Sequence, residues 1–168
     1  IDPVAVTDEQ RADVRRRFGL DQPFVLLVGT LEPRKNLSGL VEAFAGLARN
    51  RPDLDLVLVG PDGRNEDLGA RITAAGLGER AKPLGFVADA DKHALYAEAA
   101  AFCSPSLREG FGLPVLEALA QGAPVVTSAG TSTEEVAGGA ALLVDPRDPA
   151  TIEEALARIL DDQALAAD

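Results

Sequence analysis

The chain has 168 residues, 46% of them hydrophobic and 26% charged, and this length suits one domain with a sizeable core. Its 16 Lys and Arg against 27 Asp and Glu give a formal net charge of −11, which would repel a phosphate backbone and argues against nucleic-acid binding. A single Cys and a single His exclude an intrachain disulfide and a clustered-His zinc centre.

The first element along the chain is a short helix, followed by short aliphatic runs. Residues 7–10, with the sequence TDEQ, have the pattern of a capping box and predict a helix that ends near Phe18 and Gly19. Six aliphatic runs then occur at residues 24–28, 54–59, 83–86, 101–104, 124–127 and 141–144. They are continuous rather than alternating, which is typical of parallel strands covered on both faces.

Segments with helical spacing separate these runs. Asn36 is placed to cap a helix whose apolar stripe comprises Leu37, Leu40, Val41, Phe44, Leu47 and Ala48. A second helix is indicated by Leu95, Tyr96, Ala99 and Ala100. A third, which Pro149 would open, is indicated by Ile152, Leu156, Ile159 and Leu160.

Strands that alternate with helices predict one α/β domain over residues 1–168, built on a doubly wound, Rossmann-like parallel sheet of about six strands. Right-handed crossovers would place the carboxyl end of every strand along one edge of that sheet. Ligands of such folds bind in the loops at this edge. No internal repeat, low-complexity segment or linker interrupts the chain.

The loop after the first strand combines a glycine with two adjacent cations. Gly29 allows a close backbone approach, Arg34 and Lys35 supply positive charge, and the following helix adds its N-terminal dipole. In a chain of charge −11 this pair is the local exception that an anionic ligand needs. The alternative is a solvated pair of surface charges. The P-loop and G-x-G-x-x-G patterns are absent, which weighs against an ATPase and a dinucleotide dehydrogenase.

The loop after the fourth strand has the pattern of an anion-binding helix start. Gly110 and Gly112 free the backbone to present successive N–H groups, and Pro114 suits the first helical turn. Glu109 precedes this helix and Glu117 lies about one turn inside it, so both could face a ligand at the helix mouth. A carboxylate can accept hydrogen bonds from two neighbouring hydroxyls of a sugar. The alternatives are a capping role for Glu109 and a solvated Glu117, although the apolar neighbours of Glu117 disfavour the latter.

Three further features of the sequence give weaker evidence for a ligand site. The hydroxyl-rich loop at residues 127–135 either contacts phosphate or caps the next helix, and the sequence leaves both open. His93 is predicted to face solvent. Cys103 lies in a predicted strand and is interpreted as a small core residue.

Several of these motifs together resemble one known family. Residues 109–117, EGFGLPVLE, resemble the Glu-x7-Glu signature of the retaining GT-B glycosyltransferases of the family 4 or group 1 type, which include sucrose synthases and many bacterial mannosyltransferases. Residues 28–36, VGTLEPRKN, are similar to the diphosphate loop of that family. Further matches, in order and spacing, lie at residues 84–87, 101–106, 117–126 and 133–136. The resemblance covers essentially the whole chain and implies the C-terminal, nucleotide-sugar-binding half of a GT-B fold.

The resemblance also implies individual roles. Arg34 and Lys35 would neutralise the donor's diphosphate and stabilise the leaving nucleoside diphosphate. Glu109 would meet the hydroxyls of the donor sugar, and Glu117 would hold those of the ribose. Residues 85–87 would lie against the base, and backbone amides at the helix start would contact sugar or phosphate. The donor-binding positions besides Glu117 are thus Gly29, Phe86, Gly110, Phe111 and Gly112.

For the whole enzyme, the resemblance implies transfer of a sugar from a nucleoside-diphosphate sugar to a glycan or a lipid-linked acceptor. The resemblance implies no metal and no other cofactor. No general base is implied either, because the departing phosphate assists the acceptor on the same face. The EPRKN form of the first loop favours members that use GDP-mannose. We expect an N-terminal acceptor-binding domain that this sequence lacks, so the chain alone should be inactive. If the protein associates with a membrane surface, we expect that domain to make the contact. The expected location of the protein is the cytoplasm.

Two alternatives remain open at this point. The chain could be a non-catalytic sugar-nucleotide-binding subunit that joins a separate acceptor chain. It could also belong to a GT-B epimerase acting on a sugar nucleotide, although a single His provides little acid–base chemistry for that reaction.

Overall fold

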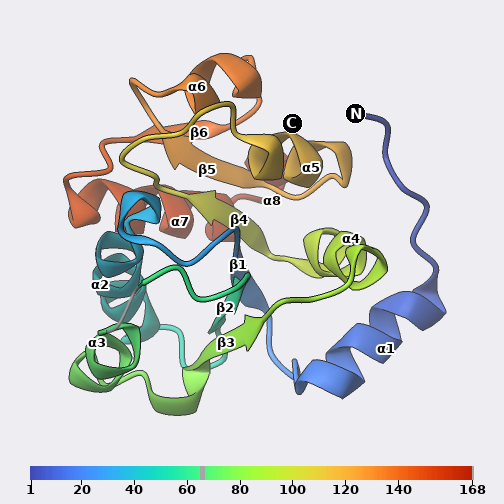
Figure 1. The fold of residues 1–168 in the computed structure, drawn as a ribbon, viewed down its shortest axis with the longest axis horizontal. Coiled ribbons are helices and arrows are strands. Elements are labelled where there is room, and N and C mark those ends of the chain that lie inside the picture. The colour runs from blue at the N-terminus through green and yellow to red at the C-terminus, as the bar shows by residue number, and fades with distance from the viewer. Residues whose placement is uncertain (65–66, 168) are drawn as a thin grey trace.

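A parallel sheet lies at the centre of the molecule in a computed structural model that describes residues 1–64 and 67–167 (Figure 1). Its strands are β1 (Phe24–Val28), β2 (Asp55–Val59), β3 (Ala81–Gly85), β4 (Ala101–Ser104), β5 (Val125–Ser128) and β6 (Leu142–Val144). Every pairing is parallel, in the order β3-β2-β1-β4-β5-β6. This is the strand order of a doubly wound Rossmann fold, so the predicted fold class is confirmed.

Helices follow the strands as the sequence predicts. Those of the described residues are α1 (Asp8–Phe18), α2 (Leu37–Ala48), α3 (Leu68–Ala74), α4 (Asp89–Glu98), α5 (Leu113–Ala120), α6 (Ser132–Ala137), α7 (Pro149–Asp161) and α8 (Gln163–Ala167). The capping box of α1 is present, because Thr7 and Gln10 exchange hydrogen bonds between side chain and backbone. Helix α3 is an addition to the prediction, since its seven residues bury only Leu68 and Ile72.

Two layers of helices cover the two faces of the sheet. Val25 and Leu27 of β1 belong to a core shared with α2, α3 and α7. Phe24, Leu26 and Val28 face the other core, which α1, α4, α5 and α6 complete. Figure 1 shows α2, α3 and α7 on one side of the strands and α1 and α4 on the other. Burial on both faces explains why the strands read as continuous aliphatic runs.

The change of direction in the winding positions the candidate site. Strands β1 and β4 are neighbours, yet β1 leads into α2 on one face and β4 leads into α5 on the other. The chain therefore leaves these two neighbouring strands towards opposite faces of the sheet, so the carboxyl ends of β1 and β4 form the switch point of the fold. Doubly wound folds bind their ligands at this place.

Candidate functional site

Asn36 ties together the loops that form the carboxyl edge. Its side-chain amide donates to the carbonyl oxygens of Pro105 at 3.0 Å and Pro146 at 2.6 Å, and the residue is only 7% exposed. The residue does occupy the N-cap position of α2, but its side chain makes no capping hydrogen bond, so that part of the prediction is wrong. Its backbone is left-handed, with φ 59°, a conformation that Asn tolerates. A backbone bond of 2.8 Å from Leu107 to Arg34 adds a second link between the β1 and β4 loops.

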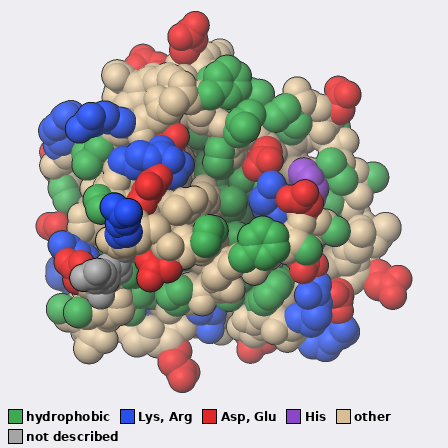
Figure 2. All heavy atoms as spheres, viewed as in Figure 1, with side chains coloured by type: hydrophobic (Ala, Val, Ile, Leu, Met, Phe, Trp, Pro, Cys, Tyr) green, Lys and Arg blue, Asp and Glu red, His purple; other side chains and the backbone are tan. Residues whose placement is uncertain are grey.

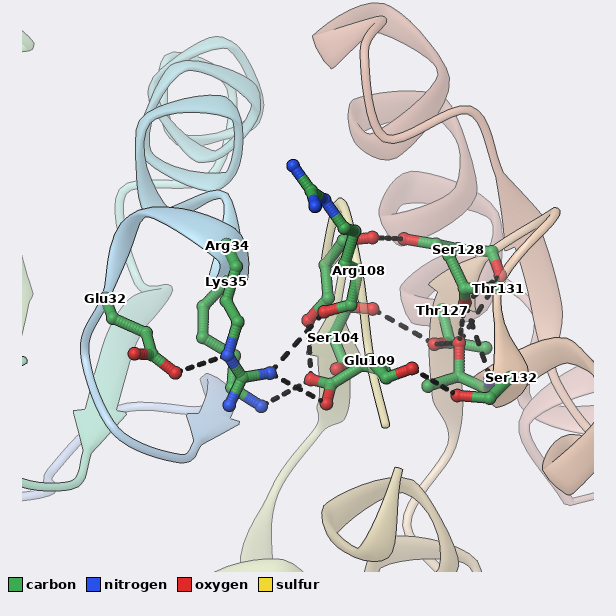
Figure 3. A network of polar contacts seen from close by, with 12 residues as sticks. Glu32, Arg34, Lys35, Ser104, Arg108, Glu109, Thr127, Ser128, Thr131 and Ser132 are labelled. Atoms are coloured by element: carbon green, nitrogen blue, oxygen red, sulfur yellow. Dashed lines mark hydrogen bonds and ion pairs between the residues drawn. The ribbon is translucent and has the colours of Figure 1, made fainter. Parts of the chain in front are cut away.

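Glu109 is the centre of a charged network that joins these loops (Figure 3). Its carboxylate accepts hydrogen bonds from Lys35 Nζ, from Ser106 Oγ at 2.9 Å and from Arg34 Nη1 at 3.0 Å. Burial alone would raise the pKa of Glu109, but the bonds and charges of Lys35, Ser106 and Arg34 outweigh it and hold the pKa below its ordinary value. Glu109 is therefore an anion held by two cations, and it does not cap α5, whose N-cap is Gly112.

The two cations differ in exposure. The Lys35 side chain is 5% exposed, whereas that of Arg34 is 44% exposed and also pairs with Glu32. The alternative of a solvated surface pair is therefore wrong for Lys35. Gly29 makes room for Lys35, since a Cβ at position 29 would lie 3.0 Å from Lys35 Cε. Arg34 is the cation that an incoming anion can reach first.

Glu117 is held separately by α4. Lys92 Nζ lies 3.1 Å from its Oε1, and the Tyr96 hydroxyl donates to its Oε2 at 2.9 Å. The Glu117 side chain is 21% exposed, so the alternative of a solvated glutamate is wrong. Sequence reasoning missed both partners, although they lie four residues apart on α4 and so share one face of that helix.

An open groove of about 640 Å³ lies beside this network, within the roughly 300–1,000 Å³ range of small-molecule sites. Its lining comprises Arg34, Lys35, Arg108, Glu109, Gly110, Phe111, Gly112, Leu113 and Pro114. The groove thus combines the predicted cations with the glycine-rich start of α5. Figure 2 shows basic side chains on the left of this face and hydrophobic ones towards its middle. Phe86 lies outside the lining residues, 81% exposed at the end of β3.

The hydroxyls at the end of β5 and in the loop that follows it make hydrogen bonds within the protein. Thr127 Oγ1 donates to the carbonyl oxygen of Ser104 at 3.0 Å, and Ser128 Oγ donates to that of Ser106 at 2.7 Å. Ser132 Oγ donates to the carbonyl oxygen of Glu109 at 3.0 Å, and Thr131 caps α6. The capping interpretation of this loop is thus confirmed for Thr131, and the hydroxyls of Ser128 and Ser132 bond to the Glu109 loop on the side away from Arg34 and Lys35 (Figure 3), while contact with phosphate stays a prediction.

The single His and the single Cys of the chain both contact other parts of the protein. His93 is half-buried, with its Nδ1 3.0 Å from the Gln121 side-chain amide, so the prediction of a solvent-facing ring is wrong in part. Cys103 is fully buried in β4, as predicted, and burial raises the pKa of its thiol.

One further cavity in the described part of the chain lacks comparable chemistry. A cavity of about 330 Å³ at the opposite edge of the sheet is lined without any charged side chain. Within residues 1–64 and 67–167, no group of three or more His, Cys, Asp or Glu side chains is arranged to hold a metal ion. No helix there has the length and apolar character needed to cross a membrane.

Comparisons with known proteins agree with this picture. The sequence profile of the family described as glycosyl transferases group 1 matches residues 8–168. The O-antigen chain mannosyltransferase B of Escherichia coli is 41% identical over 145 residues, which cover 85% of this chain and 38% of that protein. The crystal structure of HepE from Anabaena in complex with UDP and glucose has a TM-score of 0.85 at 26% identity, covering 96% of this chain and 45% of that one.

A third comparison concerns the fold alone. The C-terminal domain of a glycosyl transferase group 1 family protein (LpcC) from Francisella tularensis has a TM-score of 0.73 at 20% identity, covering 99% of this chain and 88% of that one. By contrast, the chain spans less than half the length of the Escherichia coli and Anabaena proteins.

Proposed function

The chain belongs to the glycosyl transferases group 1 family, and we propose that it binds the nucleoside-diphosphate-sugar donor of a retaining glycosyltransferase. The observation that carries this proposal is the meeting of Arg34, Lys35 and Glu109 beside the glycine-rich start of α5. A helix start with cations next to it suits a diphosphate, and a carboxylate suits sugar hydroxyls.

The diphosphate would take Arg34 as its main partner. Arg34 is exposed in the groove, and its guanidinium has a fork geometry that fits phosphate oxygens. Lys35 lies deeper and is paired with Glu109, so it would add charge from below the diphosphate. The same positive charges would stabilise the leaving nucleoside diphosphate as negative charge develops on it.

The two glutamates would contact different parts of the donor. Glu109, which lies beside the two cations, would accept hydrogen bonds from hydroxyls of the sugar. Glu117 follows the glycine-rich turn within α5, outside the lining of the groove, and is held by α4; it would accept hydrogen bonds from the ribose hydroxyls. The exposed Phe86 and its neighbours at the end of β3 would lie against the base. No general base is assigned, and the departing phosphate would assist the acceptor on the same face.

For the whole protein we propose mannosyl transfer, with GDP-mannose as the donor and a glycan or lipid-linked acceptor. The name of the Escherichia coli relative supports mannose, while the Anabaena structure was solved with UDP and glucose. The acceptor would bind to a second domain outside this chain, and the proposed location is the cytoplasm. A membrane-bound acceptor would be reached through that second domain.

A titration series with this chain tests the donor site. Calorimetry would measure the affinities of GDP, UDP, GDP-mannose and UDP-glucose for the wild type, Glu109→Gln and Glu117→Gln. Each lost contact to a charged acceptor should weaken the affected ligand by about tenfold or more. Glu117→Gln should weaken nucleoside diphosphates and sugar nucleotides alike, whereas Glu109→Gln should weaken only the sugar nucleotides.

A matched control is Glu79→Gln, an exposed glutamate in the turn that precedes β3. It should leave all four affinities unchanged. The proposal would be overturned if none of the four ligands binds the wild type, or if Glu109→Gln weakens the bare nucleotides as much as the sugar nucleotides. Tighter binding of the UDP pair would replace GDP-mannose by a uridine donor.

A further inference from the structure

The carboxylate of Glu117 is held by two residues of one helix. Tyr96 Oη donates to Glu117 Oε2 at 2.9 Å, and Lys92 Nζ lies 3.1 Å from Glu117 Oε1. Each carboxylate oxygen therefore has one partner on α4. The pairing fixes the orientation of the carboxylate plane, because the two partners pull on different oxygens.

Tyr96 is the more rigid of the two partners. Its side chain is 0% exposed, and its ring packs edge-on against Phe102 with centroids 5.5 Å apart. A Phe would fill the same space, so packing gives no reason for a hydroxyl at this position. A buried hydroxyl is costly unless it has a partner, and here that partner is Glu117. Burial, together with the charge of Glu117, raises the pKa of Tyr96, so the hydroxyl remains a donor.

The capacity of the carboxylate matches a diol. An ionised carboxylate has about four acceptor positions, two on each oxygen. Lys92 and Tyr96 use one on each oxygen, which leaves one on each oxygen for two further donors. The adjacent 2′ and 3′ hydroxyls of a ribose are two such donors at a fixed spacing. A carboxylate free to rotate would lose part of this match.

We propose that Tyr96, supported by Lys92, is a positioning residue that orients Glu117 towards the ribose diol, and that the preference for ribonucleotides over deoxyribonucleotides depends on it. This inference rests on the proposed function, in which Glu117 holds the ribose. It goes further by assigning the selectivity for the sugar of the nucleotide to a residue that does not itself contact the ligand.

The test is a ratio of affinities. Calorimetry would measure the affinities of GDP, UDP and their 2′,3′-dideoxy analogues. The proteins compared would be the wild type, Tyr96→Phe, Glu117→Ala and the double variant. Tyr96→Phe should weaken the ribonucleotides by about threefold to tenfold and the dideoxy analogues by less than about twofold. In the Glu117→Ala background, adding Tyr96→Phe should change neither ligand further, because the two residues act through one contact.

Controls separate this role from a structural one. Thr127→Val removes another fully buried hydroxyl, one that bonds to Ser104 of β4 and Thr133 of α6, and should change the affinities of the ribonucleotides and the dideoxy analogues by equal factors. The ratio of two dissociation constants measured on one sample is insensitive to partial unfolding of a variant. An equal loss for both ligands in Tyr96→Phe would therefore overturn the inference.

The outcomes also distinguish the inference from its premise. If Glu117→Ala abolishes the ribo preference and Tyr96→Phe leaves it intact, the inference fails while the proposed donor site stands. If Glu117→Ala weakens ribo and dideoxy ligands equally, the ribose role of Glu117 fails, and the inference fails with it.

Discussion

The ammonium group of Lys35 and the carboxylate of Glu109 form an ion pair in which the two side chains are only 5% and 6% exposed. The residues follow neighbouring strands, β1 and β4, and are 74 positions apart in the chain. Removing one partner of such a pair leaves a buried charge without compensation. Stability and ligand binding are therefore coupled at this point of the site.

The first prediction separates the two cations. Lys35→Met should lower the free energy of unfolding by about 3–5 kcal/mol, because the buried Glu109 carboxylate then keeps only Ser106 and the exposed Arg34 as partners. Arg34→Met should lower it by less than about 1 kcal/mol, since the Arg34 side chain is itself 44% exposed and Glu109 keeps Lys35 as its buried partner. Each variant should weaken GDP and UDP binding by about tenfold or more, because each removes a cation from the phosphate site. Urea denaturation and calorimetry measure the two effects independently.

The double variant Lys35→Met/Glu109→Gln provides the check. Without the carboxylate, no buried charge is left unpaired, so most of the lost stability should return. Equal destabilisation by Lys35→Met and Arg34→Met would show that burial does not distinguish the two cations.

The second prediction concerns pH. Since the folded-state pKa of Glu109 lies below its ordinary value of 4.5, its ionisation stabilises the fold at pH values above that ordinary value. This contribution is lost as the pH falls through the lowered folded-state pKa. The stability difference between wild type and Glu109→Gln should thus be constant from about pH 7 to pH 5 and should shrink towards about pH 3. Denaturation curves of both proteins at a series of pH values would measure this difference. A stability difference that does not change with pH would contradict an ionised Glu109.

The sequence predicts the sheet well because local signals decide it. Continuous aliphatic runs, such as residues 24–28 between Pro23 and Gly29, predict both the strand and its burial on two faces. The crossover rule then brings the loops that follow β1 and β4 to one edge. The structure brings Arg34, Lys35 and Glu109 together there, while their roles in binding stay predictions.

Side-chain partners are harder to predict because they depend on distant residues. Nothing near Lys35 in the sequence indicates that its charge is buried, since its partner is 74 residues away. Asn36 is a residue type that favours helix N-caps, but its side-chain amide donates to two carbonyl oxygens of remote loops, and the side chain makes no capping hydrogen bond. The partners of Glu117 could have been predicted in part. Lys92 and Tyr96 are polar side chains four residues apart, so they lie on the same face of their helix and can share one acceptor.

The third prediction tests Asn36 as the tie between loops. Asn36→Gly keeps the left-handed backbone and removes both amide hydrogen bonds, which should cost about 1–3 kcal/mol of unfolding free energy. Asn36→Ala also has to place a Cβ in the left-handed region, so it should cost about 1–2 kcal/mol more than the glycine variant. Urea denaturation would measure the difference, and a glycine variant as stable as wild type would contradict the tie.

The fourth prediction compares two glycines at the start of α5. Gly112 has φ 92°, and a Cβ there would lie 2.7 Å from Thr133 Cγ2, whereas a Cβ on Gly110 would have no neighbour within 4 Å. Gly112→Ala should therefore lower the free energy of unfolding by about 1–3 kcal/mol through backbone strain and the clash, and Gly110→Ala by less than about 0.5 kcal/mol. Thr133→Ser removes the clashing methyl group and keeps the hydroxyl that bonds to Thr127, so it should restore part of the loss in Gly112→Ala. The remainder is the backbone strain, which no change at position 133 can relieve. If Gly110→Ala and Gly112→Ala were equally stable in urea, the left-handed turn before α5 would not be required.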